Sequence, residues 1–191
     1  MKMKMKIQKR HQVLAVSLLL VLIVLGAAAA IFLKPGGAID LSSARIPGEA
    51  LGRSWSGPSG LALNDFQALA GMSEDEKQAI AVLRSQLEPA GVSGIADFTY
   101  RQKGNLLSQA AVKIYVFKTQ ELCQKWVNEN YQGPGWDSTY RKIRKPGCVC
   151  FETLAGRKQI AATGRILVMA SSQGNSDIHL RLLDLYLRRL W

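Results

Sequence analysis

The chain has 191 residues, a net charge of +11 and 48% hydrophobic residues. Five of its basic residues lie among the first ten, and setting them aside leaves a net charge of +6 for the rest of the chain. Residues 61–191 are long enough to form one domain with a hydrophobic core of its own. No segment of about 20–50 residues repeats, which excludes a solenoid or a propeller.

An apolar run without a charged side chain extends from Val13 to Leu33 and follows a basic leader that has no acid. At about 1.5 Å per residue, a helix of this length spans the ~30 Å hydrocarbon core of a bilayer. Basic flanks remain in the cytoplasm. The sequence therefore predicts a cytoplasmic tail over residues 1–12 and a single-pass transmembrane anchor over residues 13–33. The remainder would be periplasmic or extracellular, held at a bacterial inner membrane.

A cleaved signal peptide is the alternative interpretation of this leader, because Ala27–Ala30 offers the small residues that a signal peptidase needs. The apolar run continues through Ile31, Phe32 and Leu33. A signal peptide has a shorter apolar core of about 7–15 residues. The length of the run favours an uncleaved signal anchor that contacts the lipid bilayer.

Residues 34–60 are rich in proline and glycine, which predicts a linker between the anchor and the domain. Trp55 is a large apolar residue in this stretch, and we expect it to dock on the domain. Ser73 and Glu76 have the spacing of a capping box, which predicts the start of a helix. Gly91 predicts its end, because glycine readily adopts the left-handed backbone found there.

Alternating apolar and polar residues predict two strands, over residues 96–101 and 110–116, joined as an antiparallel hairpin. Thr119 is expected to cap a second helix. Further strands are predicted over residues 139–143, 147–154, 158–162 and 165–171, followed by a last amphipathic helix from about Ser176. This order predicts an α+β fold over residues 61–191, with one antiparallel sheet and two to three helices packed on one face.

Two stretches support a resemblance to known proteins. Residues 114–119, Ile-Tyr-Val-Phe-Lys-Thr, lead from a strand into an amphipathic helix, and residues 164–171, Gly-Arg-Ile-Leu-Val-Met-Ala-Ser, precede the last helix. With Leu87–Gly91, these stretches make residues 80–191 resemble the small extracytoplasmic α+β modules of bacterial membrane-tethered proteins and lipoproteins. The resemblance implies a fold and a location. It implies no catalytic residue, because most such modules have no assigned activity.

Catalytic motifs of the hydrolases, metalloproteases and nucleotide-binding enzymes are missing from the sequence. The only histidine after the leader is His179, which we expect at a solvated position early in the last helix. Asp97 and Glu152 are expected on solvent-facing sides of strands. The sequence therefore predicts a protein that is not an enzyme and has no catalytic residue, cofactor or metal ligand. A thiol-dependent or hydrolytic enzyme is retained as an alternative.

The three cysteines are Cys123, Cys148 and Cys150. Cys148 and Cys150 lie two residues apart in a predicted strand and so point to the same face. A bridge between such close neighbours is expected to distort the strand, so the favoured disulfide joins Cys123 to one of them. Three unbridged thiols in the core are the alternative.

A cluster of cations is the most prominent surface feature of the sequence. It consists of Arg141, Lys142, Arg144 and Lys145, next to the aromatic residues Trp136 and Tyr140. Such a patch attracts anionic ligands. A solvated edge strand is the alternative, because lysine and arginine protect sheet edges from unwanted pairing. Nucleic acid is disfavoured as a partner, because no nucleic-acid-binding motif accompanies the patch.

These observations predict a membrane-anchored extracytoplasmic module that binds a ligand or an envelope protein. The ligand would be a partner protein, an anionic group, or a small molecule on the open face of the sheet. A structural subunit of an inner-membrane complex is the alternative.

Overall fold

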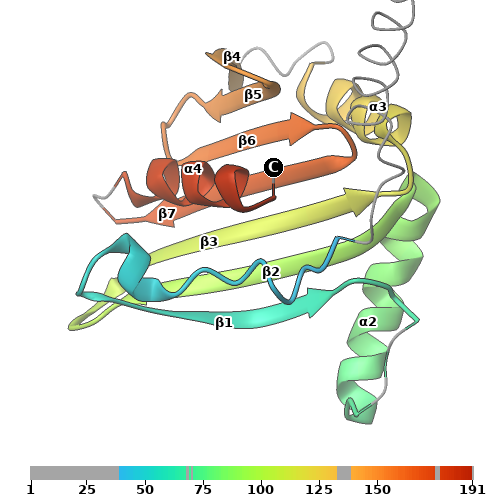
Figure 1. Ribbon diagram of the computed structural model, residues 1–191, viewed down its shortest axis with the longest axis horizontal. Coiled ribbons are helices and arrows are strands. Elements are labelled where there is room, and N and C mark those ends of the chain that lie inside the picture. Colours follow the sequence, from blue (N-terminus) through green and yellow to red (C-terminus); the bar gives the residue numbers. More distant parts are fainter. Residues whose placement is uncertain (1–38, 68, 70, 133–138, 175–176, 191) are drawn as a thin grey trace, which may run out of the picture. The chain divides into compact units, whose positions relative to one another are not determined.

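A seven-stranded antiparallel sheet is the centre of the computed structural model (Figure 1). The structure describes residues 39–67, 69, 71–132, 139–174 and 177–190. Across the sheet the strands lie in the order β1-β2-β3-β7-β6-β5-β4. Their bounds are β1 Trp55–Leu63, β2 Val92–Gln102, β3 Asn105–Phe117, β4 Tyr140–Lys145, β5 Cys148–Thr153, β6 Lys158–Thr163 and β7 Ile166–Gln173. The predicted α+β class with a single antiparallel sheet is confirmed.

Three α-helices and two short 3₁₀ helices accompany the sheet within the described residues. They are η1 Gly48–Leu51, α2 Glu74–Leu87, η2 Glu88–Ala90, α3 Gln120–Tyr131 and α4 Ile178–Leu190. The predicted capping box is present, because Ser73 accepts a hydrogen bond from the Glu76 backbone and Glu76 accepts one from the Ser73 backbone. Gly91 has a left-handed backbone with φ of 83° and follows η2, as expected. Thr119 caps α3 by accepting a hydrogen bond from Leu122 N.

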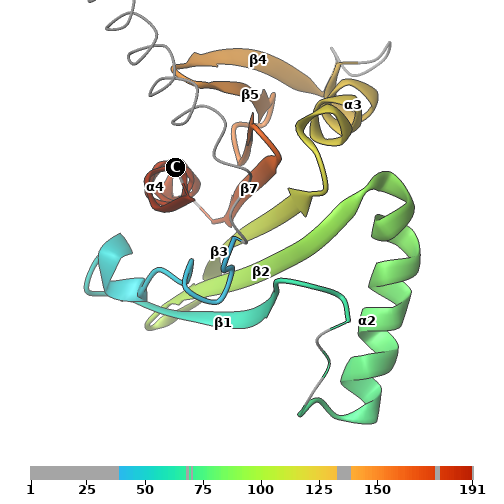
Figure 2. The same cartoon turned by 45° about the vertical axis from the view of Figure 1, so that its right-hand side comes forward.

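The helices cover both faces of the sheet, so the prediction that they share one face is wrong. Figure 2 shows α4 on one side of the sheet and α2 and α3 on the other. The α4 side chains Leu182 and Tyr186 pack with Phe98 and other even-numbered residues of β2, β3 and β7. On the opposite face, Cys123 and Val127 of α3 pack with the odd-numbered residues of those strands and with β5 and β6. Two cores therefore lie back to back, separated by the sheet.

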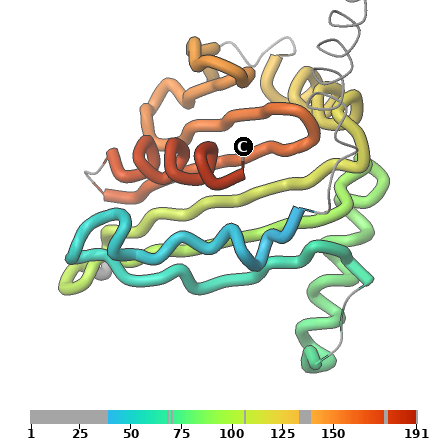
Figure 3. Tube along the Cα trace, viewed as in Figure 1, coloured from blue at the N-terminus to red at the C-terminus, as the bar shows by residue number. Residues whose placement is uncertain are grey.

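The predicted linker over residues 34–60 is wrong for residues 39–60, which are part of the domain. Residues 39–54 form a segment before β1, and residues 55–60 belong to β1 itself. Leu41, Ile46, Leu51 and Trp55 are at most 7% exposed and belong to the same core as α4. Trp55 thus docks on the domain, as expected. Figure 3 shows this segment running alongside β1 and β2. Its apolar side chains belong to the same core cluster as Phe98 of β2 and the buried face of α4.

Hydrogen bonds join this N-terminal segment to the C-terminal helix. Arg189 donates to the carbonyl of Ser43, with 3.0 Å between Nη2 and the oxygen, and Arg181 donates to the carbonyl of Leu51 at 3.3 Å. Among the described residues, no helix has the length and apolar character that crossing a bilayer requires. The predicted anchor Val13–Leu33 lies outside the described residues and stays a prediction.

Candidate functional site

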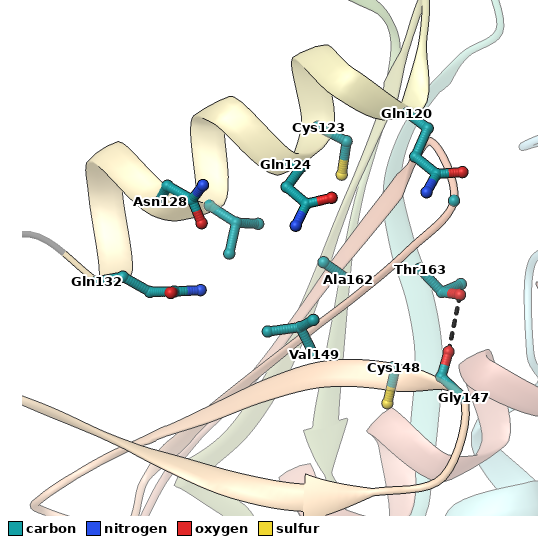
Figure 4. Close-up of a pocket in the computed structure, with 12 residues that line it drawn as sticks. Gln120, Cys123, Gln124, Asn128, Gln132, Gly147, Cys148, Val149, Ala162 and Thr163 are labelled. Atoms are coloured by element: carbon teal, nitrogen blue, oxygen red, sulfur yellow. Dashed lines mark hydrogen bonds between the residues drawn. The ribbon is translucent and has the colours of Figure 1, made fainter.

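A cleft of about 280 Å³ lies between α3 and the turns at the near ends of β5 and β6 (Figure 4). Its lining residues are Gln120, Cys123, Gln124, Val127, Asn128, Gln132, Gly147, Cys148, Val149, Ala162, Thr163 and Gly164. None of them carries a charged side chain. On a domain with an excess of basic residues, this uncharged cleft is suited to ligands without net charge.

Four carboxamides form one wall of the cleft. Gln120, Gln124, Asn128 and Gln132 recur every four residues, a spacing that places side chains on one face of a helix. Figure 4 shows them on the side of α3 that faces β5. Their side chains make no hydrogen bond to any group in the described part of the chain. Each carboxamide offers both a donor and an acceptor, so this carboxamide row can pair with a ligand's polar groups.

The floor of the cleft is apolar and comes from both α3 and the sheet. Cys123 and Val127 are buried side chains of α3, and Ala162 of β6 lies in the same core cluster. Burial raises the pKa of the Cys123 thiol to about 11, because the thiolate would lose its hydration. Cys123 is therefore a neutral thiol near pH 7. The floor can accept a small apolar side chain while the carboxamide row binds polar groups above it.

Two tight turns form the far wall of the cleft. Gly147 and Gly164 have positive φ values of 74° and 49°, which permit the turns before β5 and before β7. The Thr163 hydroxyl donates to the Gly147 carbonyl at 2.9 Å and joins the two turns (Figure 4). This contact fixes the wall opposite α3.

The favoured disulfide between Cys123 and another cysteine is absent from the structure, because the sheet separates the Cys123 thiol from Cys150 and the Cys148 sulfur lies next to that of Cys150. The Cys123 thiol belongs to the core under α3, whereas Cys150 belongs to the core under α4. Figure 4 shows the sulfur of Cys148 pointing away from Cys123. All three cysteines are free thiols in the structure. Cys148 Sγ instead lies 2.7 Å from Cys150 Sγ.

The predicted cationic patch lies on β4, which is an edge strand, so the alternative interpretation of an edge is confirmed. The alternation of the strand divides the four cations between two faces. Arg141 pairs with Glu152 at 2.6 Å, and Lys145 pairs with Asp184 of α4. Lys142 and Arg144 are exposed and lie on the face of Tyr140. The cations therefore form no single surface, and Trp136 lies outside the described residues.

A second concavity of about 350 Å³ lies on the sheet face that carries Tyr115 and Met169. Lys113, whose ammonium is 3.0 Å from the Asp97 carboxylate, lines it together with Lys158. Burial lowers the pKa of Lys158, and the neighbouring charge of Lys113 lowers it further. Since Asp97 already neutralises Lys113, the concavity itself offers one unpaired ammonium, that of Lys158, among the described residues that line it.

The expectation that His179 is solvated is wrong. His179 is the second residue of α4 and is 1% exposed, and its Nδ1 lies 2.8 Å from the Ser172 hydroxyl. This pair resembles part of a hydrolase triad in composition, but both residues are buried and cannot meet a substrate from solvent. Glu152, expected on a solvated face, is also largely buried, with its side chain 12% exposed.

The cleft as a binding site was not predicted from the sequence, although the pattern of one of its two walls is visible there. A carboxamide at four successive i, i+4 positions is visible in the sequence from Gln120 to Gln132. The facing wall comes from residues 147–149 and 162–164. Its position opposite α3 depends on pairing between strands that are distant in the sequence.

No protein-family model matches the chain, and no curated protein matches it. Among solved structures, the chain is similar to the extracellular domain of PknH from Mycobacterium tuberculosis. The two are 11% identical, with a TM-score of 0.49, over 82% of this chain and 97% of that chain. These comparisons assign no activity to the chain.

Proposed function

We propose that the chain is a membrane-anchored extracytoplasmic interaction module that binds an extended, uncharged peptide segment of a partner protein. The carboxamide row of α3 carries this proposal, because its four side chains have no hydrogen-bond partner among the described residues and line an uncharged cleft. The role is binding, not catalysis. The anchor Val13–Leu33 would hold the module at the inner membrane.

The spacing of the carboxamides supports a peptide ligand. Four helical residues correspond to a rise of about 6 Å. In an extended peptide, backbone groups that point the same way recur every two residues, or about 6.6 Å. Each Gln or Asn can therefore donate to a peptide carbonyl and accept from a peptide N–H in register. The full row of about 18 Å matches a segment of about six residues.

The floor adds a selection by size and polarity. Val149 and Ala162 leave room for small apolar side chains, and the narrow volume of about 280 Å³ disfavours aromatic ones. A charged side chain would lose hydration there without gaining an ionic partner. The expected segment is therefore rich in alanine, valine, serine, threonine or glycine. A saccharide is disfavoured, because none of the described residues that line the cleft has an aromatic ring that could act as a stacking surface.

The experiment uses the full chain, immobilised in detergent micelles. The immobilised chain is exposed to a library of N-acetylated, C-amidated hexapeptides made from those five amino acids. The dissociation constant of an enriched peptide is then measured by fluorescence anisotropy. Replacing Gln124 or Asn128 by alanine removes about 1 kcal/mol of hydrogen bonding and should weaken binding about five-fold. The double variant should show a loss of about 25-fold.

Lys125→Ala is the matched control, because Lys125 lies between the two carboxamides in sequence but has a side chain that is 70% exposed and outside the cleft. Its affinity should equal that of the unaltered chain. Three results would contradict the proposal: no enriched peptide, equal affinity of the double variant, or retention of a neutral oligosaccharide in place of peptides.

A further inference from the structure

Two cysteines of β5 form a close pair beneath α4, on the sheet face opposite the cleft floor. Cys148 and Cys150 are alternate residues of the strand and share a face, and their sulfur atoms are 2.7 Å apart. This separation exceeds the length of a disulfide bond by only about 0.7 Å. Cys150 is fully buried, whereas Cys148 is half-buried.

The backbone around the pair is compatible with a bond. Alternate residues of a strand have Cα atoms about 6.6 Å apart, which lies within the range of about 4.4–6.8 Å found for disulfides. Cys148 is the first residue of β5 and follows Gly147, whose φ of 74° belongs to the turn. The first residue can adjust more readily than one in the middle of a strand. The expected distortion of the strand is therefore confined to its start.

We infer that Cys148 and Cys150 form a reversible intrastrand disulfide by exchange with a small-molecule disulfide such as oxidised glutathione. The Cys148 thiolate attacks one sulfur of the oxidant, forms a mixed disulfide and releases one glutathione thiolate, which takes up a proton. Cys150 then loses its proton and attacks the Cys148 sulfur, and the second glutathione leaves as a thiol. The two cysteines are oxidised, and one oxidant disulfide is reduced to two thiols.

The order of these steps follows from the environment of each sulfur. Burial raises the pKa of Cys150 to about 12, so Cys150 is protonated near pH 7 and reacts second. Cys148 is less buried and meets the oxidant first. Cys123 stays outside the reaction, because it lies in the other core across the sheet.

The bond would stiffen one wall of the cleft. That wall is lined by Gly147, Cys148 and Val149. The bond would link two residues of β5, the strand that follows Gly147, and so restrict the motion of its start. Just before the pair, Lys145 binds Asp184 of α4. The inference does not depend on the proposed peptide ligand, because it concerns the thiols alone.

The test compares full chain in detergent before and after incubation with oxidised glutathione. Both samples are unfolded, labelled with N-ethylmaleimide and analysed by intact mass and peptide mass spectrometry. The reduced sample should carry a label on each of the three cysteines. The oxidised sample should carry one label, on Cys123. Its peptide with Cys148 and Cys150 should be unlabelled and lighter by two hydrogen atoms than the same peptide with two free thiols.

Two variants distinguish the pair from other thiol chemistry. Cys123→Ser should oxidise at the unchanged rate and retain no label afterwards. Cys150→Ser should stop at the mixed disulfide and retain one glutathione on Cys148. The inference is overturned if the oxidised unaltered chain accepts three labels, if it retains glutathione on Cys148, or if Cys123 is found in a bridge. The unaltered chain and Cys123→Ser decide these outcomes even if Cys150→Ser does not fold.

Discussion

The hydroxyl groups of Tyr100 and Tyr186 lie 2.7 Å apart in the core beneath α4. Tyr100 donates its only hydroxyl hydrogen to the carbonyl of Ile46 at 2.9 Å, so Tyr186 must be the donor between the two rings. Burial raises the pKa of both phenols, which keeps them protonated. One chain of hydrogen bonds thus connects α4, β2 and the segment before β1.

This polarity predicts unequal effects of two similar substitutions. Tyr186→Phe removes a donor, while Tyr100 still binds Ile46, so the free energy of unfolding should fall by about 1 kcal/mol. Tyr100→Phe removes both the donor to the Ile46 carbonyl and the acceptor of the Tyr186 hydroxyl, and it should cost about 2–4 kcal/mol. Urea unfolding of both variants measures the difference. Equal losses would contradict the assigned direction of the hydrogen bonds.

Truncation tests the place of residues 39–60 in the fold. A chain that begins at residue 61 lacks the buried side chains of Leu41, Ile46, Leu51 and Trp55 and most of β1. Losing even one large buried side chain costs about 2–5 kcal/mol, so the loss of four exceeds the usual stability of a domain. The truncated chain should show no cooperative thermal transition by circular dichroism, whereas a chain beginning at residue 39 should show one.

Acid should weaken the contact between β4 and β5. Arg141 donates two hydrogen bonds to Glu152, at 3.0 and 2.6 Å, and Gln159 donates another at 3.2 Å. The Arg141 hydrogen bonds are the main cause that lowers the pKa of Glu152 from 4.5. A lowered pKa in the folded state stabilises the fold above the unfolded value, and this stabilisation is lost as the pH falls through the folded value.

Glu152→Gln should therefore lower the free energy of unfolding near neutral pH. When the pH falls below about 4, the free energy of unfolding of this variant should decrease less than that of the unaltered chain. Urea unfolding at several pH values provides the measurement. Glu129→Gln serves as the control, since the Glu129 carboxylate is exposed and 3.8 Å from Lys125. Parallel pH curves for Glu152→Gln and the unaltered chain would contradict the prediction.

Close packing between β1 and β2 depends on Gly60. A Cβ at this position would collide with the carbonyl oxygen of Asp97, and the φ of 130° is unsuited to other residues. Gly60→Ala should lower the free energy of unfolding by about 3 kcal/mol. Gly71→Ala, at a φ of 83° with open space around it, should cost only about 1–2 kcal/mol. Similar melting temperatures for the two variants would refute this account.

Local patterns determined much of the fold. The capping box at Ser73, the helix stop at Gly91 and the alternation around Phe98 each depend on residues close in sequence, and all three were predicted. The face on which each helix packs was not predictable in the same way. An apolar stripe on a helix requires burial but does not specify which side of the sheet provides it. The side on which each helix packs depends on how the strands pair in the sheet, and this pairing joins residues that are distant in the sequence, such as those of β3 and β7.

The segment before β1 and the cleft were missed for related reasons. Composition averaged over residues 34–60 emphasises glycine and proline, while the few apolar residues that anchor the segment, such as Leu41 and Ile46, follow no regular period. The carboxamide row is regular, but its significance depends on the turns at Gly147 and Gly164 that face it. The antiparallel order of β4 to β7 brings those turns together.

The hydrogen bond from Arg189 to Ser43 joins residues that are 146 positions apart, and Arg181 reaches Leu51 across 130 positions. Such contacts can form only after ribosomes have finished nearly the whole polypeptide. Until the last helix has been synthesised, the apolar side chains of the early part of the chain stay uncovered. Prematurely terminated chains would keep that apolar surface exposed and become substrates for proteases. Only chains whose synthesis is complete would therefore escape degradation.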